Sequence, residues 1–271
     1  MVRIKEILQW IDSWAPFKYA ESWDNSGLQV GSPKSPVEKV LVALDPTSLV
    51  IAEAREIKCQ CVVTHHPLLM QSINSVRSDK WPGAVISEAL VSGIGIIAAH
   101  TNLDAARGGT NAQFVKLLKL EAVEPLDPVA EFSGEGQYLG LGVVGLLPGE
   151  ETVKSLSARV SELLGRPAVR VCGDMQRRVK KVGVCTGSGA SLIGKVLRAE
   201  AEAFITGDLK YHDARLAEER GLVIIDVGHF ASERIVLEPI ADFLRTRAES
   251  EGARLEVFIS KSEKDPFNII A

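Results

Sequence analysis

Histidines in this chain occur where predicted strands end, and histidine is the commonest side chain that binds metal ions. The sequence contains only five of them. They follow short apolar runs at 61–64, 94–99, 203–206 and 221–226, and they are His65, His66, His100, His212 and His229. Since open α/β sheets usually bind ligands at the carboxyl ends of their strands, this distribution predicts a polar site at a sheet edge.

His65 and His66 are adjacent, in the segment "CVVTHHP". Neighbouring side chains on extended chain point in opposite directions, so this pair suits two ions placed side by side, or one ion plus a structural hydrogen bond. A histidine at a strand end is more often an ordinary polar loop residue. The adjacency and the following Pro67, which stiffens the turn, favour a ligand role.

A second candidate group lies in "HTNLDAARGG", residues 100–109. Asp104 could be a metal ligand, although an Asp in such a loop is most often a helix cap or a turn residue. His100 could be a ligand, a hydrogen-bond donor to a ligand, or an acid/base. We expect a helix to begin near Thr110, after the Gly108–Gly109 pair.

The strongest partner of these residues is "DVGHFASERIVL", residues 226–237. A helix that begins near Ser232 would leave His229 in the preceding turn and Glu233 on the first turn, so that both side chains converge. The ordinary alternative is a solvent-exposed Glu233 that is stabilised by the helix dipole.

Histidines and carboxylates in this combination are suited to two divalent metal ions. A carboxylate can bridge two ions about 3.5–4 Å apart, which an imidazole cannot do. Nitrogen and oxygen ligands suit Zn, Mn, Fe, Co or Ni, and the residue types do not choose among them. Water activated by such ions becomes a nucleophile near neutral pH, so the chemistry expected is hydrolysis.

Two other segments have weaker signals. Residues 187–196, "GSGASLIGKV", resemble a phosphate-binding loop, but Val196 stands where a Ser or Thr would hold Mg²⁺. We therefore expect a packed helix in this segment. The backbone N–H groups of residues 187–189, at the start of that helix, could still cradle an anion. Residues 17–33 are typical of a turn-rich segment. An acidic side chain in its stretch Trp23, Asp24 and Asn25 could add to the metal site.

Short strands alternate with helical patterns, which predicts an α/β fold. Strands at 39–45, 61–64 and 94–99, with helices near 47–57 and 83–92, have the same order as strands at 181–187, 203–206 and 221–226, with helices near 190–200 and 211–220. We interpret this order as an internal duplication, giving two α/β units with mixed sheets at 1–127 and 128–271, whose terminal segments could cross over. Residues 121–137, rich in Pro, Gly and acid, are expected to be a linker between the units.

Composition excludes several classes of protein. A net charge of −4 without a dense basic block argues against a nucleic-acid surface. No apolar stretch approaches the ~18 residues of a membrane span, and the amphipathic segment at the N-terminus does not resemble a signal peptide. Four cysteines without a CxxC pair predict no disulfide framework, so we expect a cytoplasmic protein.

The chain resembles the GTP cyclohydrolase 1 type 2 homologue family, also called the NIF-three-like family. The segments that carry the resemblance span nearly the whole chain in family order, and they are "ESWDNSGLQVG", "VVTHHP", "AAHTNLDAARGGTN", "GVCTGSGAS", "AFITGDLKYHDA" and "DVGHFASE". The resemblance implies two intertwined α/β units, a homohexameric ring and two metal ions per chain, with ligands at His65, His66, Asp104, His229 and Glu233. It further implies that Glu233 is the bridging carboxylate.

Two functions of different class follow as hypotheses. The first is a metal-dependent hydrolase of a nucleotide such as GTP, or of another small molecule, in which His100 or His212 transfers protons. The second is a non-enzymatic metal-binding, metal-delivery or interaction protein. A third, DNA binding by a ring, fits poorly with the negative charge.

Overall fold

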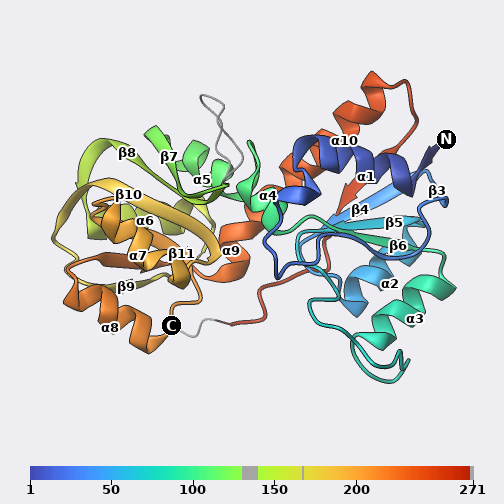
Figure 1. Cartoon of the computed structure of the whole chain (residues 1–271), viewed down its shortest axis with the longest axis horizontal. Coiled ribbons are helices and arrows are strands. Elements are labelled where there is room, and N and C mark those ends of the chain that lie inside the picture. Colours follow the sequence, from blue (N-terminus) through green and yellow to red (C-terminus); the bar gives the residue numbers. More distant parts are fainter. Residues whose placement is uncertain (130–139, 167, 269–271) are drawn as a thin grey trace. The chain divides into compact units, whose positions relative to one another are not determined.

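The computed structural model describes residues 1–129, 140–166 and 168–268, and the chain forms two compact units. The first unit comprises Met1–Leu103 and Val236–Lys264. The second comprises Asp104–Ile235 and the segment from Asp265 onward. The chain therefore leaves each unit and returns to it, as an intertwined α/β fold requires (Figure 1).

A five-stranded mixed sheet forms the centre of the first unit, in the order β13-β4-β5-β6-β2. Strands β13, β4, β5 and β6 are parallel, and β2 is antiparallel to β6. The bounds of its strands are β2 Gly27–Val30, β4 Lys39–Ala43, β5 Cys61–Thr64, β6 Gly95–Ala98 and β13 Glu256–Ile259, with a separate small pair, β1 Val2–Arg3 and β3 Pro36–Val37. Strands β5 and β6 are buried throughout, which explains why they read as continuous apolar runs.

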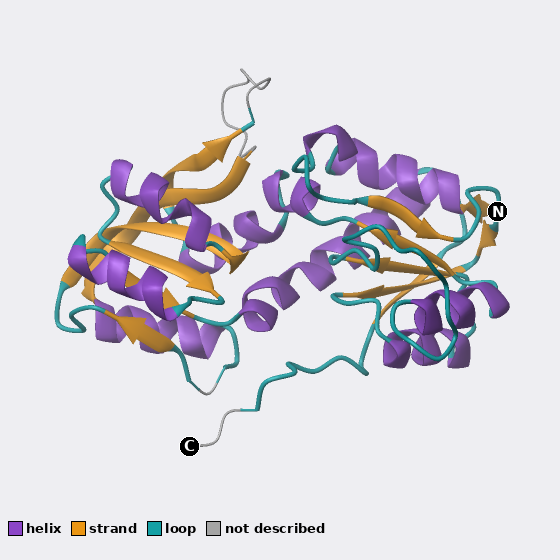
Figure 2. Cartoon of the chain, turned by 60° about the horizontal axis from the view of Figure 1, so that its bottom comes forward, coloured by secondary structure: helices purple, strands orange, loops and turns teal. Residues whose placement is uncertain are grey.

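Helices cover both faces of this sheet. Helices α1 and α10 lie on one side, and α2 and α3 lie on the other (Figures 1 and 2). Their bounds are α1 Ile4–Trp14, η1 Phe17–Tyr19, α2 Ser48–Glu56, α3 Gly83–Val91 and α10 Leu237–Ser250. Thr47 caps α2, because its hydroxyl accepts a hydrogen bond from the N–H of Val50 at 3.2 Å. The predicted helices near 47–57 and 83–92 are thus confirmed.

The second unit is built on a six-stranded mixed sheet in the order β7-β8-β10-β11-β12-β9. Its parallel centre, β10-β11-β12, has the same chain order as β4-β5-β6 in the first unit. The bounds are β7 Glu121–Pro128, β8 Gly140–Thr152, β9 Arg170–Cys172, β10 Arg178–Ser188, β11 Ala203–Gly207 and β12 Val223–Asp226. The order of parts matches the predicted repeat, and common ancestry of the halves stays a prediction.

Apolar side chains of this second sheet alternate between two clusters, one on each face. Val143 and Ile205 belong to one cluster, while their neighbours Val144 and Phe204 belong to the other. Helices pack on both clusters, and their bounds are α5 Thr110–Leu118, α6 Val153–Leu163, η2 Ala190–Leu192, α7 Ile193–Arg198, α8 Tyr211–Glu219 and α9 His229–Glu233. A sheet with two buried faces needs apolar residues at every position, so its strands lack the alternation of a half-exposed sheet.

Two expectations about the middle of the chain change. Residues 121–128 of the expected linker form strand β7, because they pair with β8 in an antiparallel ladder; residues 130–137 of it lie outside the described residues. The segment 104–127 consequently packs with the second unit, whereas we expected the boundary between residues 127 and 128. Two short helices span two of the three boundaries, α4 Thr101–Ala105 and η3 Arg234–Val236.

Among the described residues, no helix is both long and apolar enough to span a membrane.

Candidate metal centre

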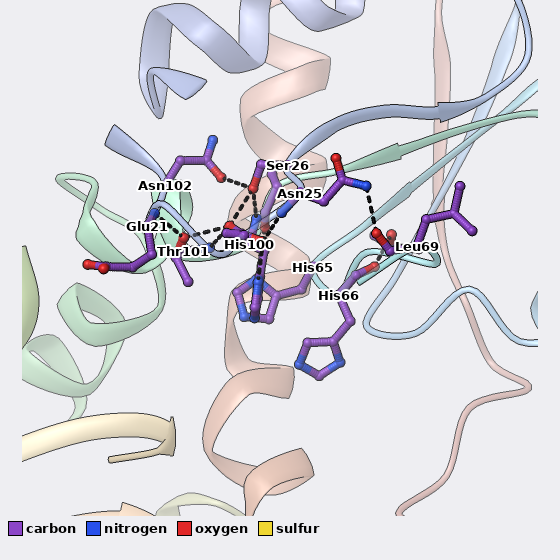
Figure 3. A network of polar contacts seen from close by, with 12 residues as sticks. Glu21, Asn25, Ser26, His65, His66, Leu69, His100, Thr101 and Asn102 are labelled. Atoms are coloured by element: carbon purple, nitrogen blue, oxygen red, sulfur yellow. Dashed lines mark hydrogen bonds and ion pairs between the residues drawn. The ribbon is translucent and has the colours of Figure 1, made fainter. Parts of the chain in front are cut away.

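Three histidines gather in the first unit, at the ends of neighbouring parallel strands. His65 and His66 follow β5, and His100 follows β6; the two strands pair in register, with Thr64 opposite Ala98. The imidazole centroids lie 5.0 Å apart for His65 and His66, 5.2 Å for His65 and His100, and 5.6 Å for His66 and His100. One nitrogen from each ring lies within 4.8 Å of the others (Figure 3).

Each of these three rings is oriented through its Nδ1 atom. The Nδ1 of His65 lies 2.9 Å from the carbonyl oxygen of Ala99. The Nδ1 of His66 lies 2.8 Å from a carboxylate oxygen of Asp45, and the Nδ1 of His100 lies 2.8 Å from one of Asp24. Carbonyl and carboxylate oxygens only accept, so Nδ1 carries the proton and the Nε2 lone pair is directed elsewhere. This is the arrangement that metal-binding histidines show.

The predicted divergence of His65 and His66 is only partly correct. Their Nδ1 atoms do contact different partners, but the rings lie 5.0 Å apart, closer than strand alternation implies. The reason is that β5 ends at Thr64, so both residues lie beyond the extended backbone on which alternation depends.

Asp24 comes from the turn-rich segment 17–33 and organises this group. Its side chain is fully buried and accepts hydrogen bonds from His100 Nδ1, from the N–H of Thr101 at 3.1 Å and from the Ser26 hydroxyl at 2.9 Å. Burial acts to raise the pKa of Asp24, but these hydrogen bonds outweigh it and hold the pKa well below its usual range. Asp24 is therefore an anion beside His100.

The second unit contributes a histidine and a glutamate on one short helix. Helix α9 begins at His229, and not near Ser232 as predicted, so that His229 and Glu233 are one turn apart on the same face. His229 Nε2 lies 3.0 Å from a carboxylate oxygen of Glu233, while His229 Nδ1 lies 2.7 Å from Asp208. Glu233 is 3% exposed, so the alternative of a solvent-exposed surface glutamate is wrong.

Gly187, at the end of β10, makes room for this pair. A Cβ atom at residue 187 would lie 2.0 Å from Glu233 Oε1 and 3.3 Å from His229 Nε2. The N–H of Gly187 donates to the Ser232 hydroxyl at 2.9 Å, and the N–H of Gly189 donates to the Thr206 hydroxyl at 2.9 Å. These two N–H groups hold α9 and β11 against β10, so the expectation that they cradle an anion is wrong.

Asp104 lies in α4, at the start of the second unit. The hydroxyl of Thr110, the first residue of α5, donates a hydrogen bond to its carboxylate. Burial raises the pKa of the Cys185 thiol, and the negative charges of Asp104 and Glu233 raise it further. Both carboxylates therefore lie near one buried thiol within the second unit.

His212 has a different environment. It is exposed on the first turn of α8, where its ring packs edge-on against Tyr211 with centroids 5.4 Å apart. In the part of the chain that the structure describes, His212 belongs to no group of side chains that could hold a metal ion.

The donor set fits divalent transition metals. Imidazole nitrogens oriented by carbonyl or carboxylate partners suit zinc, iron and their neighbours, and the buried Glu233 carboxylate supplies hard oxygen donors. The orienting residues Asp45 and Asp208 were not predicted to have a role, although Asp45 ends one predicted strand and Asp208 follows another.

Comparison with known proteins decides the family. The family model "Duf34/NIF3 (NGG1p interacting factor 3)" matches residues 2–266. The chain belongs to the Duf34/NIF3 family. Among curated relatives, a protein of Clostridium perfringens is 34% identical over 99% of this chain and 100% of its own, and one of Streptomyces coelicolor is 36% identical over 98% and 94%. Both are named "GTP cyclohydrolase 1 type 2 homolog", so the resemblance predicted from the sequence is confirmed.

Solved structures of similar proteins share the fold. A Staphylococcus aureus protein has a TM-score of 0.91 at 27% identity, covering 99% of both chains. Reduced HcgD from Methanocaldococcus jannaschii has a TM-score of 0.79 at 29% identity, covering 96% of this chain and 98% of its own. The mixed α/β architecture predicted from the sequence is therefore confirmed.

Proposed function

We propose that this Duf34/NIF3 protein binds two divalent metal ions and hydrolyses a nucleotide or another small molecule. The ligands would be His65, His66, Asp104, His229 and Glu233, with Glu233 bridging. One observation carries the proposal: the Nδ1 atom of every histidine in this set contacts a carbonyl or carboxylate oxygen, at 2.7–2.9 Å, which is the orienting contact that metal-binding histidines typically make.

When bound, the two ions would supply Lewis-acid chemistry and lower the pKa of water toward neutrality. The chain would supply proton transfer through His100. Its Nε2 is the basic atom, because Nδ1–H is held by the Asp24 carboxylate. His212 is a second candidate for proton transfer, from the exposed start of α8.

The names of the relatives support a nucleotide as substrate, since both the Clostridium and the Streptomyces proteins are called homologues of a GTP cyclohydrolase. We further propose a cytoplasmic homo-oligomer, a hexameric ring by family resemblance. A nucleic-acid partner fits poorly with the net charge of −4.

The test is turnover by metal-replete protein across a panel of nucleotides and small phosphate or amide compounds. We expect hydrolysis of at least one compound, and we expect Glu233→Gln to abolish it, while Glu219→Gln, at the exposed end of α8, leaves it unchanged. A fully metallated protein that hydrolyses nothing in the panel, yet transfers its metal rapidly to an apo acceptor, would instead establish the metal-delivery alternative.

A further inference from the structure

Trp23 is an exposed aromatic side chain beside the three histidines of the first unit. It is 57% exposed, and its ring meets the His100 ring edge-to-face, with centroids 5.9 Å apart and an interplanar angle of 75°. Exposure of an indole forgoes the hydrophobic free energy that its burial would contribute. An exposed tryptophan next to a polar site is therefore a candidate for contact with a ligand.

The backbone that carries Trp23 is held firmly. The next residue, Asp24, is fully buried and hydrogen-bonded to His100, Thr101 and Ser26. On the preceding side, the N–H of Glu21 donates to the Thr101 hydroxyl at 2.9 Å.

The same segment also contacts the loop that carries the other two histidines. The Asn25 side-chain amide donates to the carbonyl oxygen of Leu69 at 2.6 Å (Figure 3). Trp23 is thus a rigidly mounted aromatic surface, anchored both to the strand end of His100 and to the loop after His65 and His66.

We infer that Trp23 is a stacking surface for a planar heteroaromatic ring, which it would present to the imidazole cluster. Every planar base offers a π-face to an indole, and stacking of this kind tolerates different bases. This inference rests on the proposed function and adds to it the substrate class: a compound with a flat heteroaromatic ring, and not a purely aliphatic or sugar-phosphate ester.

The chain offers a matched control in Trp81. Trp81 is 71% exposed and directly precedes the Pro82 that caps α3, and within the described residues no ring contact joins it to a histidine. Replacement of Trp81 also removes an exposed tryptophan but leaves the three histidines untouched. A difference between the Trp23 and Trp81 variants therefore reports on the position of Trp23 beside those histidines.

The experiment is calorimetric titration of full-length, metal-replete protein with three probes: adenosine 5′-monophosphate, guanosine 5′-monophosphate and ribose 5-phosphate, which lacks the base. We expect both nucleotides to bind more tightly than ribose 5-phosphate. In Trp23→Leu, nucleotide binding should weaken about tenfold or more, with ribose 5-phosphate binding unchanged. Trp23→Phe should recover part of the loss, and Trp81→Leu should match the wild type.

The inference would be overturned if Trp23→Leu bound the nucleotides as tightly as the wild type does. It would also be overturned if the wild type bound the nucleotides no more tightly than ribose 5-phosphate. A change in the solution mass of Trp23→Leu would also overturn it, because Trp23 would then be a contact between copies of the chain. Metal content measured on the same samples separates the two proposals. If Trp23→Leu retains both its metals and its nucleotide affinity, only the stacking surface is refuted. If the wild-type protein takes up no metal, the proposed function is refuted.

Discussion

At the scale of single residues, the candidate site depends on acceptors that orient imidazoles. Asp24, Asp45 and Asp208 each hold the Nδ1 atom of a different histidine, at 2.7–2.8 Å. None of these aspartates can be recognised as a partner from chain spacing, because each lies 20 or more positions from the histidine it contacts. The residue types of the proposed ligands were predictable from the sequence, and the atoms that orient them required the fold.

Gly187→Ala is the residue-scale prediction. The added Cβ would meet Glu233 Oε1 at 2.0 Å, so α9 must shift, and we expect metal affinity to fall about tenfold or more. Gly187 has φ +63°, so the variant also incurs a backbone penalty of about 1 kcal/mol. The check is metal affinity by competition with a chelator, alongside thermal unfolding.

Gly221→Ala is the matched control for that variant. Gly221 has φ +70° and nothing within 4 Å of the added atom, so it incurs the same backbone penalty without the clash. We expect similar loss of stability in the two apo-proteins, with unchanged metal affinity in Gly221→Ala. Equal metal affinities in both variants would show that Gly187 does not make room for a ligand.

At the scale of elements, local patterns predicted the strands and helices better than their ends and partners. The helices after β4, β5, β10 and β11 lie where periodicity placed them. Helix α9 begins three residues earlier than predicted, since Gly228 with φ +79° allows the turn directly before His229. Strand β7 was mistaken for a linker because its two prolines and its acids are disfavoured in strands, and pairing with β8 overrides that preference.

Helix α2 supplies a pH-dependent prediction. The Glu53 carboxylate accepts hydrogen bonds from the Ser260 hydroxyl at 2.6 Å and from the N–H groups of Lys261 and Ser262 at 2.9 and 3.2 Å, which ties the chain after β13 to the helix. Burial acts to raise the pKa of Glu53, but these hydrogen bonds lower it overall from its usual 4.5. The resulting stabilisation is complete above about pH 4.5 and is lost as pH falls through the lower folded-state pKa.

We therefore expect Glu53→Gln to lower the melting temperature at pH 7 by roughly 2–4 °C, the shift for about 1 kcal/mol in a chain of this size. The difference from wild type should shrink below pH 4.5. Melting curves from pH 3 to 8 test this, with Glu56→Gln, exposed on the same helix, as the control. A difference that grows as the pH falls would contradict the assigned sign.

At the scale of the whole molecule, sequence patterns reveal least about which segments of the chain belong to which unit. The segment Val236–Lys264 returns to the first unit, where α10 packs on β4 and β13, and β13 pairs in parallel with β4. Nothing in the periodicity of α10 indicates which sheet it covers, because an amphipathic helix can pack on any apolar face. The overall α/β class and the family were nevertheless predictable from the sequence.

Leu244→Ala tests this assignment. Leu244 is fully buried on α10, so the truncation should cost about 2–5 kcal/mol. We expect hydrogen exchange to accelerate in the first unit, at β4 and β13, and to change little at β10–β12, because α10 packs on β4 and β13. Leu156→Ala, fully buried on α6 of the second unit, should give the opposite pattern. Equal acceleration in both units for both variants would show that they unfold as one.

The central claim, that the chain binds two divalent metal ions through the five proposed ligands, is tested most directly by metal content per chain. Elemental analysis of purified full-length protein should find two divalent ions per chain in the wild type and in His212→Ala, whose histidine lies exposed on α8. Substantial loss should follow in His65→Ala and in Glu233→Gln, one from each unit, while circular dichroism shows that both remain folded. Wild-type metal content in both of these folded variants would contradict the account.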